Sequence, residues 1–185
     1  AVHTDGNASC WGANDQGVLG NGFIGQTYHN PQTVHNPTNQ SITQMALSGG
    51  FSCALMDNGE VYCWGLNDKG QLGDGTVCGN QDFSNNCSGY HQKPIMYDPV
   101  VLPNGTTAIS IFGNNDLSGS TSESDSNVCA LLNNGRLFCW GSSYSSFYDE
   151  EVMSGEVCSL CGEDGTGTYP IVVTGNNVQP GNRDW

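Results

Sequence analysis

One segment of the sequence occurs twice, and this repetition limits the possible folds more than any other feature. CALMDNGEVYCWG (residues 53–65) recurs as CALLNNGRLFCWG (residues 129–141), with both cysteines, the inner glycine and the Cys-Trp-Gly ending in register. Part of a third copy, AVHTDGNASCWG, occupies residues 1–12. Trp11 and Trp64 lie 53 positions apart, which gives the length of one repeat. Repetition at this spacing is typical of architectures in which similar units stack on one another.

Each repeat contains four short segments with the composition of β-strands. In the first full repeat they read PQTV, SITQMALS, FSCALM and EVYCWG. The last two flank Asp57-Asn58-Gly59, which suits a three-residue hairpin loop with glycine in the left-handed conformation. This loop predicts that Leu55 pairs with Val61 and that the cysteines at positions 53 and 63 face each other.

The facing cysteines predict a disulfide within each hairpin, Cys53 with Cys63 and Cys129 with Cys139. The alternative is a pair of buried free thiols. Closing a loop of about ten residues would stabilise the fold by roughly 2.5–3 kcal/mol. Cys10 has no partner in the sequence, because the matching position falls just before Ala1. We therefore expect the sequence to begin inside a repeat.

Four further cysteines lie in segments outside the hairpin pattern, and we expect them to form loop disulfides. The candidate pairs are Cys78 with Cys87 and Cys158 with Cys161, although spacing alone does not fix the connectivity. Cys-x-x-Cys at 158–161 also occurs in zinc and redox sites. A zinc site needs two further ligands at suitable spacing, and a redox site needs a βαβ unit; neither is visible in the sequence.

Charge and cysteine content exclude several classes of protein. The chain has 18 acidic residues against 4 Lys and Arg, a net charge of −14, so binding to nucleic acid or to an anionic membrane surface is disfavoured. No apolar run approaches 18 residues, so we expect no insertion into a membrane. Nine cysteines in 185 residues favour an oxidising compartment. The predicted location is therefore extracellular or at the cell surface.

A Gly-rich loop follows the Cys-Trp-Gly ending in the first two copies, WGANDQGVLGNG (11–22) and WGLNDKGQLGDGT (64–76). Together with the hairpin, this pattern resembles the regulator-of-chromosome-condensation repeat, in a cystine-rich, secreted form. The resemblance implies four-stranded blades of a β-propeller, commonly with seven blades. The third copy departs from it over residues 142–156. The repeat signature consists of Trp11, Gly12, Trp64, Gly65, Trp140 and Gly141.

The predicted fold is all-β, with about three antiparallel blades of a larger propeller. We assign 1–12 to the end of a blade, 31–65 and 99–141 to blades, and 170–185 to the start of another; residues 77–98, 113–127 and 142–164 are expected to be inserted loops. Propellers need four to eight blades to close. We therefore expect the chain to be a segment of a longer protein, the alternative being one arc of a ring completed by other chains.

The sequence offers no catalytic residues and no cofactor site. Gly20, Gly22 and Gly25 match the dinucleotide-binding pattern, but the segment that follows, NPQTVHNP, cannot form the helix that would hold a pyrophosphate. The four histidines show no metal spacing, and Ser/His/Asp catalysis has no Gly-x-Ser-x-Gly elbow to start from. Acidic loops such as 148–151 could hold Ca²⁺, but a solvated acidic surface is the simpler interpretation.

Four Asn-x-Ser/Thr sequons are candidates for N-glycosylation. Three of them lie in predicted loops. The polar segment 117–127 could carry O-linked sugars or could simply be a flexible loop. The sequon residues are Asn7, Asn39, Asn86 and Asn104.

Two functions are compatible with these features. The first is a non-catalytic structural module of a secreted or cell-surface assembly, filamentous or matrix-like, in contact with other copies, neighbouring surface proteins or glycans. The alternative is a protein-binding or inhibitor module that presents loops from one propeller face. The best-known activity of the family, nucleotide exchange on a nuclear GTPase, is intracellular and is not carried over. Aromatic candidates for binding are Tyr90, Tyr97, Tyr144, Phe147, Tyr148 and Tyr169.

Overall fold

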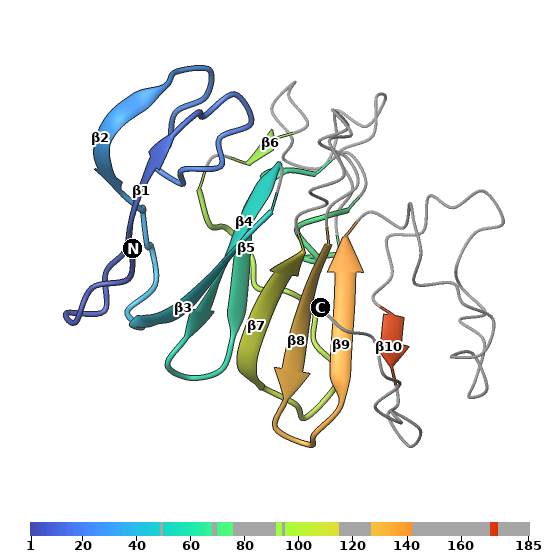
Figure 1. Cartoon of the computed structure of the whole chain (residues 1–185). Coiled ribbons are helices and arrows are strands. Elements are labelled where there is room, and N and C mark those ends of the chain that lie inside the picture. The colour runs from blue at the N-terminus through green and yellow to red at the C-terminus, as the bar shows by residue number, and fades with distance from the viewer. Residues whose placement is uncertain are drawn as a thin grey trace, which may run out of the picture.

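Three antiparallel β-sheets form the part of the chain that the structure describes (Figure 1). The structure is a computed structural model, and it describes residues 1–48, 50–67, 70–75, 92–93, 95–114, 127–141 and 171–173. Every named element in these ranges is a strand, which confirms the predicted all-β class. The same residues contain no helix long and apolar enough to cross a membrane.

Each sheet joins strands that are neighbours in the sequence. The first sheet pairs β1 (Ser9–Gly12) with β2 (Tyr28–Thr33). The second has the order β3, β4, β5, β6, and the third the order β10, β9, β8, β7. The bounds are β3 Ile42–Leu47, β4 Phe51–Met56, β5 Val61–Leu66, β6 Gln92–Lys93, β7 Ala108–Asn114, β8 Asn127–Leu132, β9 Leu137–Gly141 and β10 Ile171–Val173.

The central hairpin of each full sheet has the predicted register. Leu55 pairs with Val61 and Cys53 with Cys63 across β4 and β5. Gly59 has a φ of 84°, so the left-handed position of the loop is occupied as its sequence requires. The second copy repeats this arrangement, with Cys129 opposite Cys139 across β8 and β9. The duplicated sequence is therefore a duplicated hairpin.

The sheets do not coincide with the sequence repeats, and this corrects the predicted blade boundaries. β2, which was expected to open the blade at 31–65, pairs with β1 of the preceding sheet. Pro99 likewise bridges to Tyr62 of the second sheet. β10 pairs with β9, so Ile171–Val173 closes the third sheet instead of starting another blade. The physical reason is that each Cys-Trp-Gly strand leaves one edge free, and the next strand along the chain pairs with that edge.

Two predicted insertions are shorter than expected. Strand β6 and the fully buried Met96 fall inside the segment 77–98, so only its first part can be an insertion. The segment 113–127 overlaps the last two residues of β7 and the first residue of β8. All of 142–164 lies outside the described residues, as do 77–91 and 115–126 of the other two insertions.

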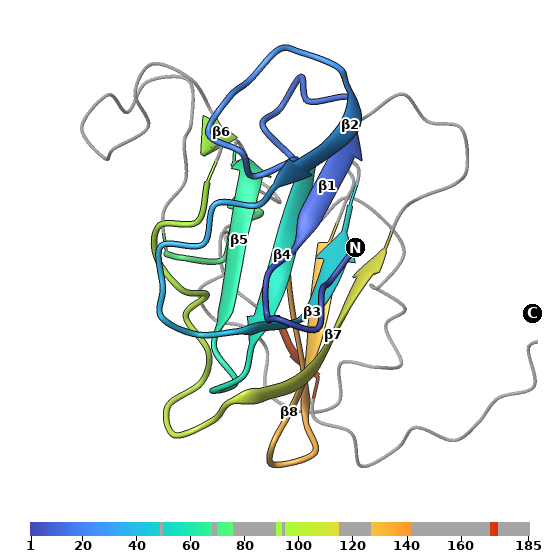
Figure 2. The same ribbon diagram turned by 90° about the vertical axis from the view of Figure 1, so that its left-hand side faces the viewer.

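The hydrophobic core lies between the sheets, which stack one behind another in Figure 2. Every residue of β4 and β5 is buried, because the second sheet has a neighbour on both faces. Met56, Tyr62 and Trp64 pack in the cluster shared with the first sheet. Phe51 and Val61 pack in the cluster shared with the third sheet. Because side chains alternate between the two faces of a strand, each hairpin contributes residues to the core on either side of it.

A glutamine joins the second and third sheets where strands β3 and β7 lie side by side. The Gln44 side chain donates a hydrogen bond from Nε2 to the Ile111 carbonyl oxygen at 2.8 Å, and its Oε1 accepts one from the Ile111 N–H at 3.0 Å. Ser110 Oγ donates to the same Oε1 at 3.1 Å. One amide side chain thus satisfies both backbone groups of Ile111 in the way that a neighbouring strand would.

Candidate binding surface

The Gly-rich loops hold their shape through one buried asparagine each. The Leu19 N–H donates to Asn14 Oδ1 at 3.0 Å, and Asn14 Nδ2 donates to the Phe23 carbonyl oxygen at 2.8 Å. In the next copy, the Leu72 N–H donates to Asn67 Oδ1 at 3.1 Å. Both asparagines are fully buried, so these bonds are shielded from water. The Trp-Gly-x-Asn pattern therefore encodes a loop braced from within.

Each braced loop covers the tryptophan of the following sheet. A Cβ atom placed on Gly20 would lie 2.7 Å from Trp64 Nε1, and one placed on Gly73 would lie 2.8 Å from Trp140 Cδ1. Trp64 Nε1 also donates a hydrogen bond to the Val18 carbonyl oxygen at 2.9 Å. The close approach of loop backbone to indole requires glycine at these positions. As a result, Trp64 is 0% and Trp140 5% exposed.

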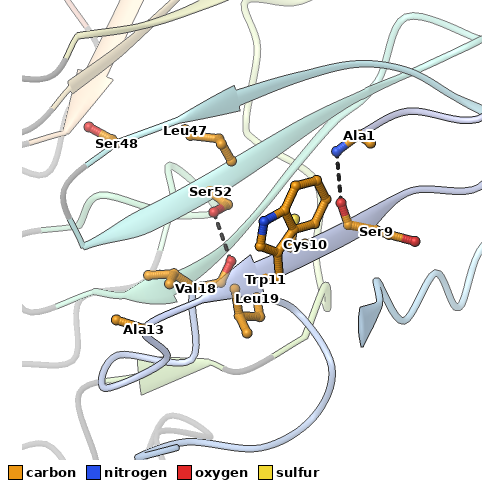
Figure 3. A pocket seen from close by; sticks show the side chains of 10 residues that line it. All are labelled: Ala1, Ser9, Cys10, Trp11, Ala13, Val18, Leu19, Leu47, Ser48 and Ser52. Atoms are coloured by element: carbon orange, nitrogen blue, oxygen red, sulfur yellow. Dashed lines mark hydrogen bonds between the residues drawn. The ribbon is translucent and has the colours of Figure 1, made fainter. Parts of the chain in front are cut away.

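Trp11 occupies the corresponding position in the first sheet but is 54% exposed. It lines a pocket of about 230 Å³ together with residues from β1, the first Gly-rich loop and the β3–β4 connection. Figure 3 shows its indole between the Ala1–Ser9 segment and the Val18 and Leu19 side chains. The lining residues are Ala1, Ser9, Cys10, Trp11, Ala13, Val18, Leu19, Leu47, Ser48 and Ser52.

The pocket lies over Trp11 at the place where a Gly-rich loop covers the matching tryptophan in the other two sheets. Its walls are mostly apolar, and the Ser52 hydroxyl donates a hydrogen bond to the Val18 carbonyl oxygen at 2.8 Å within the protein. Burial raises the pKa of the Cys10 thiol, which keeps the sulfur in its neutral, weakly nucleophilic form. The pocket wall is thus an apolar surface, and the Cys10 thiol in it stays protonated and weakly reactive.

Other exposed apolar side chains lie at the same end of the sheets as the pocket. We call this the loop end and define it by the connections 13–27, 48–50 and 70–75; the opposite, hairpin end carries the turns 3–7, 57–60 and 133–136. Phe23, in the connection between β1 and β2, is 62% exposed, and Leu47, the last residue of β3, is 53% exposed. Leu47 and Trp11 share the pocket wall. Large apolar side chains that stay in water are a common feature of protein-binding surfaces.

The structure contains both hairpin disulfides, Cys53–Cys63 and Cys129–Cys139, each with a Cα–Cα distance of 4.0 Å. The Met56 N–H donates to the Glu60 carbonyl oxygen, and alternation along the ladder then makes Cys53 and Cys63 a non-hydrogen-bonded pair, where strands approach most closely. Cys10 is a buried free cysteine. Cys78, Cys87, Cys158 and Cys161 lie outside the described residues.

The other candidate residues are placed as follows. Asn7, Asn39 and Asn104 are exposed, while Asn86 lies outside the described residues. Of the aromatic candidates only Tyr97 is described, and it is exposed. The acidic loop at 148–151 is also outside. Within the ranges that the structure describes, no group of three His, Cys, Asp or Glu side chains could hold a metal ion.

The signature tryptophans and glycines have different roles in different copies. Trp64 and Trp140 are buried contacts between sheets, whereas Trp11 is part of the pocket. Gly20, Gly22 and Gly25, which match the dinucleotide-binding pattern, all have positive φ and belong to the connection between β1 and β2, in which Gly20 packs against Trp64. No local pattern in the sequence predicts the pocket, because its walls come from three separate segments.

A carboxylate at the hairpin end of the second sheet carries the clearest electrostatic feature among the described residues. Hydrogen bonds from the Asn58 and Gln40 side chains lower the pKa of Glu60. Gln40 Nε2 lies 3.1 Å and the Tyr62 hydroxyl 3.2 Å from Glu60 Oε2. Burial and the neighbouring Glu60 raise the pKa of Tyr62. This cluster joins the β3 side of the sheet to the hairpin and is structural in character.

Comparison with protein families identifies the repeats. A family model described as the regulator of chromosome condensation (RCC1) repeat matches residues 5–55 and 58–107, which is more than half of the chain. A second model with the same description matches residues 42–71 and 124–146. The resemblance inferred from the hairpin and the Gly-rich loop is therefore confirmed.

Curated relatives share part of this region. The chain is 38% identical over 73 residues to the human probable E3 ubiquitin-protein ligase HERC3, a match that covers 40% of this chain and 7% of HERC3. It is 35% identical over 74 residues to the protein RCC2 homolog of Danio rerio, covering 40% of this chain and 15% of that protein. The matched region is thus a small part of each relative.

Solved structures show the same fold. Prp20p from Saccharomyces cerevisiae superimposes with a TM-score of 0.64 at 18% identity, over 95% of this chain and 36% of Prp20p. Human WBSCR16 superimposes with a TM-score of 0.57 at 19% identity, over 86% of this chain and 33% of that protein. At these identities the likeness concerns the arrangement of the sheets and leaves function open.

Proposed function

Because this chain belongs to the family of proteins that contain regulator of chromosome condensation (RCC1) repeats, we propose that it is a protein-binding part of a β-propeller. The partner contacts the loop end of the sheets. The observation that carries this proposal is the exposure of Phe23 and Leu47 at that end.

The composition of this surface supports binding to protein. Aromatic and other large apolar side chains supply much of the affinity at protein interfaces, because they bury a large area for little loss of conformational entropy. The net charge of −14 repels nucleic acid and favours a neutral or basic partner. Similar structures support the same proposal: Prp20p has binding properties to Gsp1p and histones, and yeast Prp20 has been solved bound to Kap60.

No catalytic step is part of this proposal. HERC3 is named as a probable ubiquitin ligase, but the match covers only 7% of that protein. The pocket offers a neutral thiol, hydroxyl groups and apolar walls. We therefore assign binding to this chain.

Quantitative affinity capture tests the proposal. Partners of the purified protein are cross-linked in extracts of the cells that make it and identified by mass spectrometry, with wild type and the Phe23→Ala/Leu47→Ala variant compared. The affinity of the variant for each purified partner is expected to fall about 10- to 30-fold, because two exposed anchors are lost. Ile109→Ala is the matched control, since Ile109 is equally exposed but lies at the start of β7, at the hairpin end. Equal affinities for all three proteins would refute the proposal.

A second candidate function is a structural module of a secreted or cell-surface assembly. The observation that favours it is the pair of disulfides, one within each of two successive sheets. Cross-links of this kind persist in oxidising surroundings and make a part durable. Electron microscopy of the protein at increasing concentration distinguishes the two functions. Filaments or two-dimensional arrays that dissolve on reduction would favour the structural function. A protein that stays monodisperse would favour the protein-binding function.

A further inference from the structure

Two of the exposed sequon asparagines lie at matching places in successive repeats. Asn39 is two residues before Ser41, and Asn104 is three residues before Thr107. Ser41 and Thr107 are equivalent, because each precedes the strand, β3 or β7, whose first N–H donates to the glycine carbonyl of the preceding hairpin. Both asparagines therefore lie at the hairpin end, one on each of two neighbouring repeats.

The loop around Asn39 is braced by its neighbours and leaves this side chain unused. The Thr38 N–H and hydroxyl both donate to Asn36 Oδ1, at 3.0 and 2.7 Å. Asn36 Nδ2 donates to the Gln40 carbonyl oxygen at 2.9 Å, and the Gln40 N–H donates to Thr38 Oγ1 at 3.2 Å. Asn39 is held at the tip of this loop with its amide exposed to water.

Asn104 lies at the corner of a tight turn. The Thr106 N–H donates to the Pro103 carbonyl oxygen at 3.0 Å, which places Asn104 and Gly105 at the two central positions of the turn. Gly105 has a φ of 74° and no atom within 4 Å of where a Cβ would lie, so the corner is open. A bulky group on Asn104 would therefore project into solvent.

We propose that Asn39 and Asn104 carry N-linked glycans, one on each of two successive repeats, and that these sugars cover the hairpin end of the sheets. The Asn-x-Ser/Thr motif supplies the acceptor, and the structure supplies an exposed amide that folding does not need. The two disulfides are consistent with the oxidising compartment in which such glycans are added. This proposal does not rest on binding at the loop end.

The glycans would leave the loop end as the accessible apolar surface. In the part of the chain that the structure describes, all three sequon asparagines, Asn7 included, lie at the hairpin end, and none lies beside Trp11, Phe23 or Leu47. A hydrophilic sugar layer hinders protein contacts where it lies. One end of the molecule is thus shielded and the other remains open.

Peptide mass spectrometry on the protein from the cells that make it tests the proposal. Treatment with peptide N-glycosidase in ¹⁸O water converts a glycosylated Asn to ¹⁸O-labelled Asp, and we expect this label at positions 39 and 104. A sample without enzyme corrects for spontaneous deamidation of the Asn104-Gly105 pair. Asn36 is an internal negative, because Pro37 blocks its sequon. Unmodified peptides at both positions would overturn the proposal.

Variants secreted from a eukaryotic host separate the two sites. Asn39→Gln and Asn104→Gln are each expected to remove one glycan step from the intact mass. Asn134→Gln is the matched control, since Asn134 is exposed in the hairpin turn at the same end but has no sequon. Thr106→Ser should keep the glycan at position 104 and Thr106→Ala should lose it. Secreted protein whose mass is unchanged in both glutamine variants would contradict the proposal.

Discussion

Replacement of Gly20 by alanine tests whether the first Gly-rich loop fixes the second sheet through Trp64. The new Cβ would lie 2.7 Å from Trp64 Nε1 and 2.8 Å from Cε2, so either the loop or the indole must move. A left-handed conformation costs a non-glycine residue about 1–2 kcal/mol. Overpacking of a well-filled core costs about 1–3 kcal/mol more. The free energy of unfolding should therefore fall by roughly 2–5 kcal/mol.

Gly25→Ala is the matched control for this substitution. Gly25 belongs to the same connection and has a φ of 85°, but no atom lies within 4 Å of its Cβ position. The control therefore pays the backbone cost alone, about 1–2 kcal/mol. Urea denaturation followed by tryptophan fluorescence measures both variants, and the emission of Gly20→Ala should also shift to the red as water reaches Trp64. Equal losses of stability in the two variants would refute the role assigned to the close contact.

Three further predictions concern stability. Cys53→Ala/Cys63→Ala should lower the free energy of unfolding by about 2–4 kcal/mol in denaturation experiments, because the unfolded chain regains the freedom of a ten-residue loop; no loss relative to wild type would contradict this. Gln44→Ala should cost about 1–3 kcal/mol and speed hydrogen exchange at the Ile111 amide, which loses its acceptor; unchanged protection of that amide would count against the bridge between sheets. Glu60→Gln should make acid unfolding less steep. Because the folded pKa of Glu60 is lowered, its contribution is present above the unfolded pKa of about 4.5 and is lost as the pH falls through the folded value. The free energy of unfolding of wild type minus that of Glu60→Gln should shrink as the pH falls, and a difference that grows would contradict this prediction.

Local chemistry made the hairpins predictable. A three-residue loop ending in glycine has few conformations, so it determines both the pairing of Leu55 with Val61 and the alignment of the two cysteines. The Gly-rich loop was recognisable for a similar reason. Its buried Asn14 and its closely packed glycines allow few other residue types at those positions. These features depend on residues close together in the chain.

Features that depend on distant segments could not be predicted in this way. The repeat pattern does not say which sheet the strand at 28–33 joins, because its composition suits either neighbour; the free edge of β1 decides it. Trp11, Trp64 and Trp140 share one motif, yet only the packing of neighbouring segments makes the first exposed and the others buried. The pocket and the Gln44 bridge likewise arise from residues far apart in sequence.

Each Gly-rich loop precedes in the sequence the tryptophan that it covers, so the packing of the sheets follows the order of the chain. The loop at 12–22 precedes the indole that it covers, Trp64, and the loop at 65–75 precedes Trp140. During synthesis each docking surface therefore leaves the ribosome before the sheet that will pack on it. Domains made in this order can fold from the N-terminus as they are synthesised. Each new sheet thus meets a completed neighbour, which shortens the time that its apolar face spends exposed to other unfinished chains.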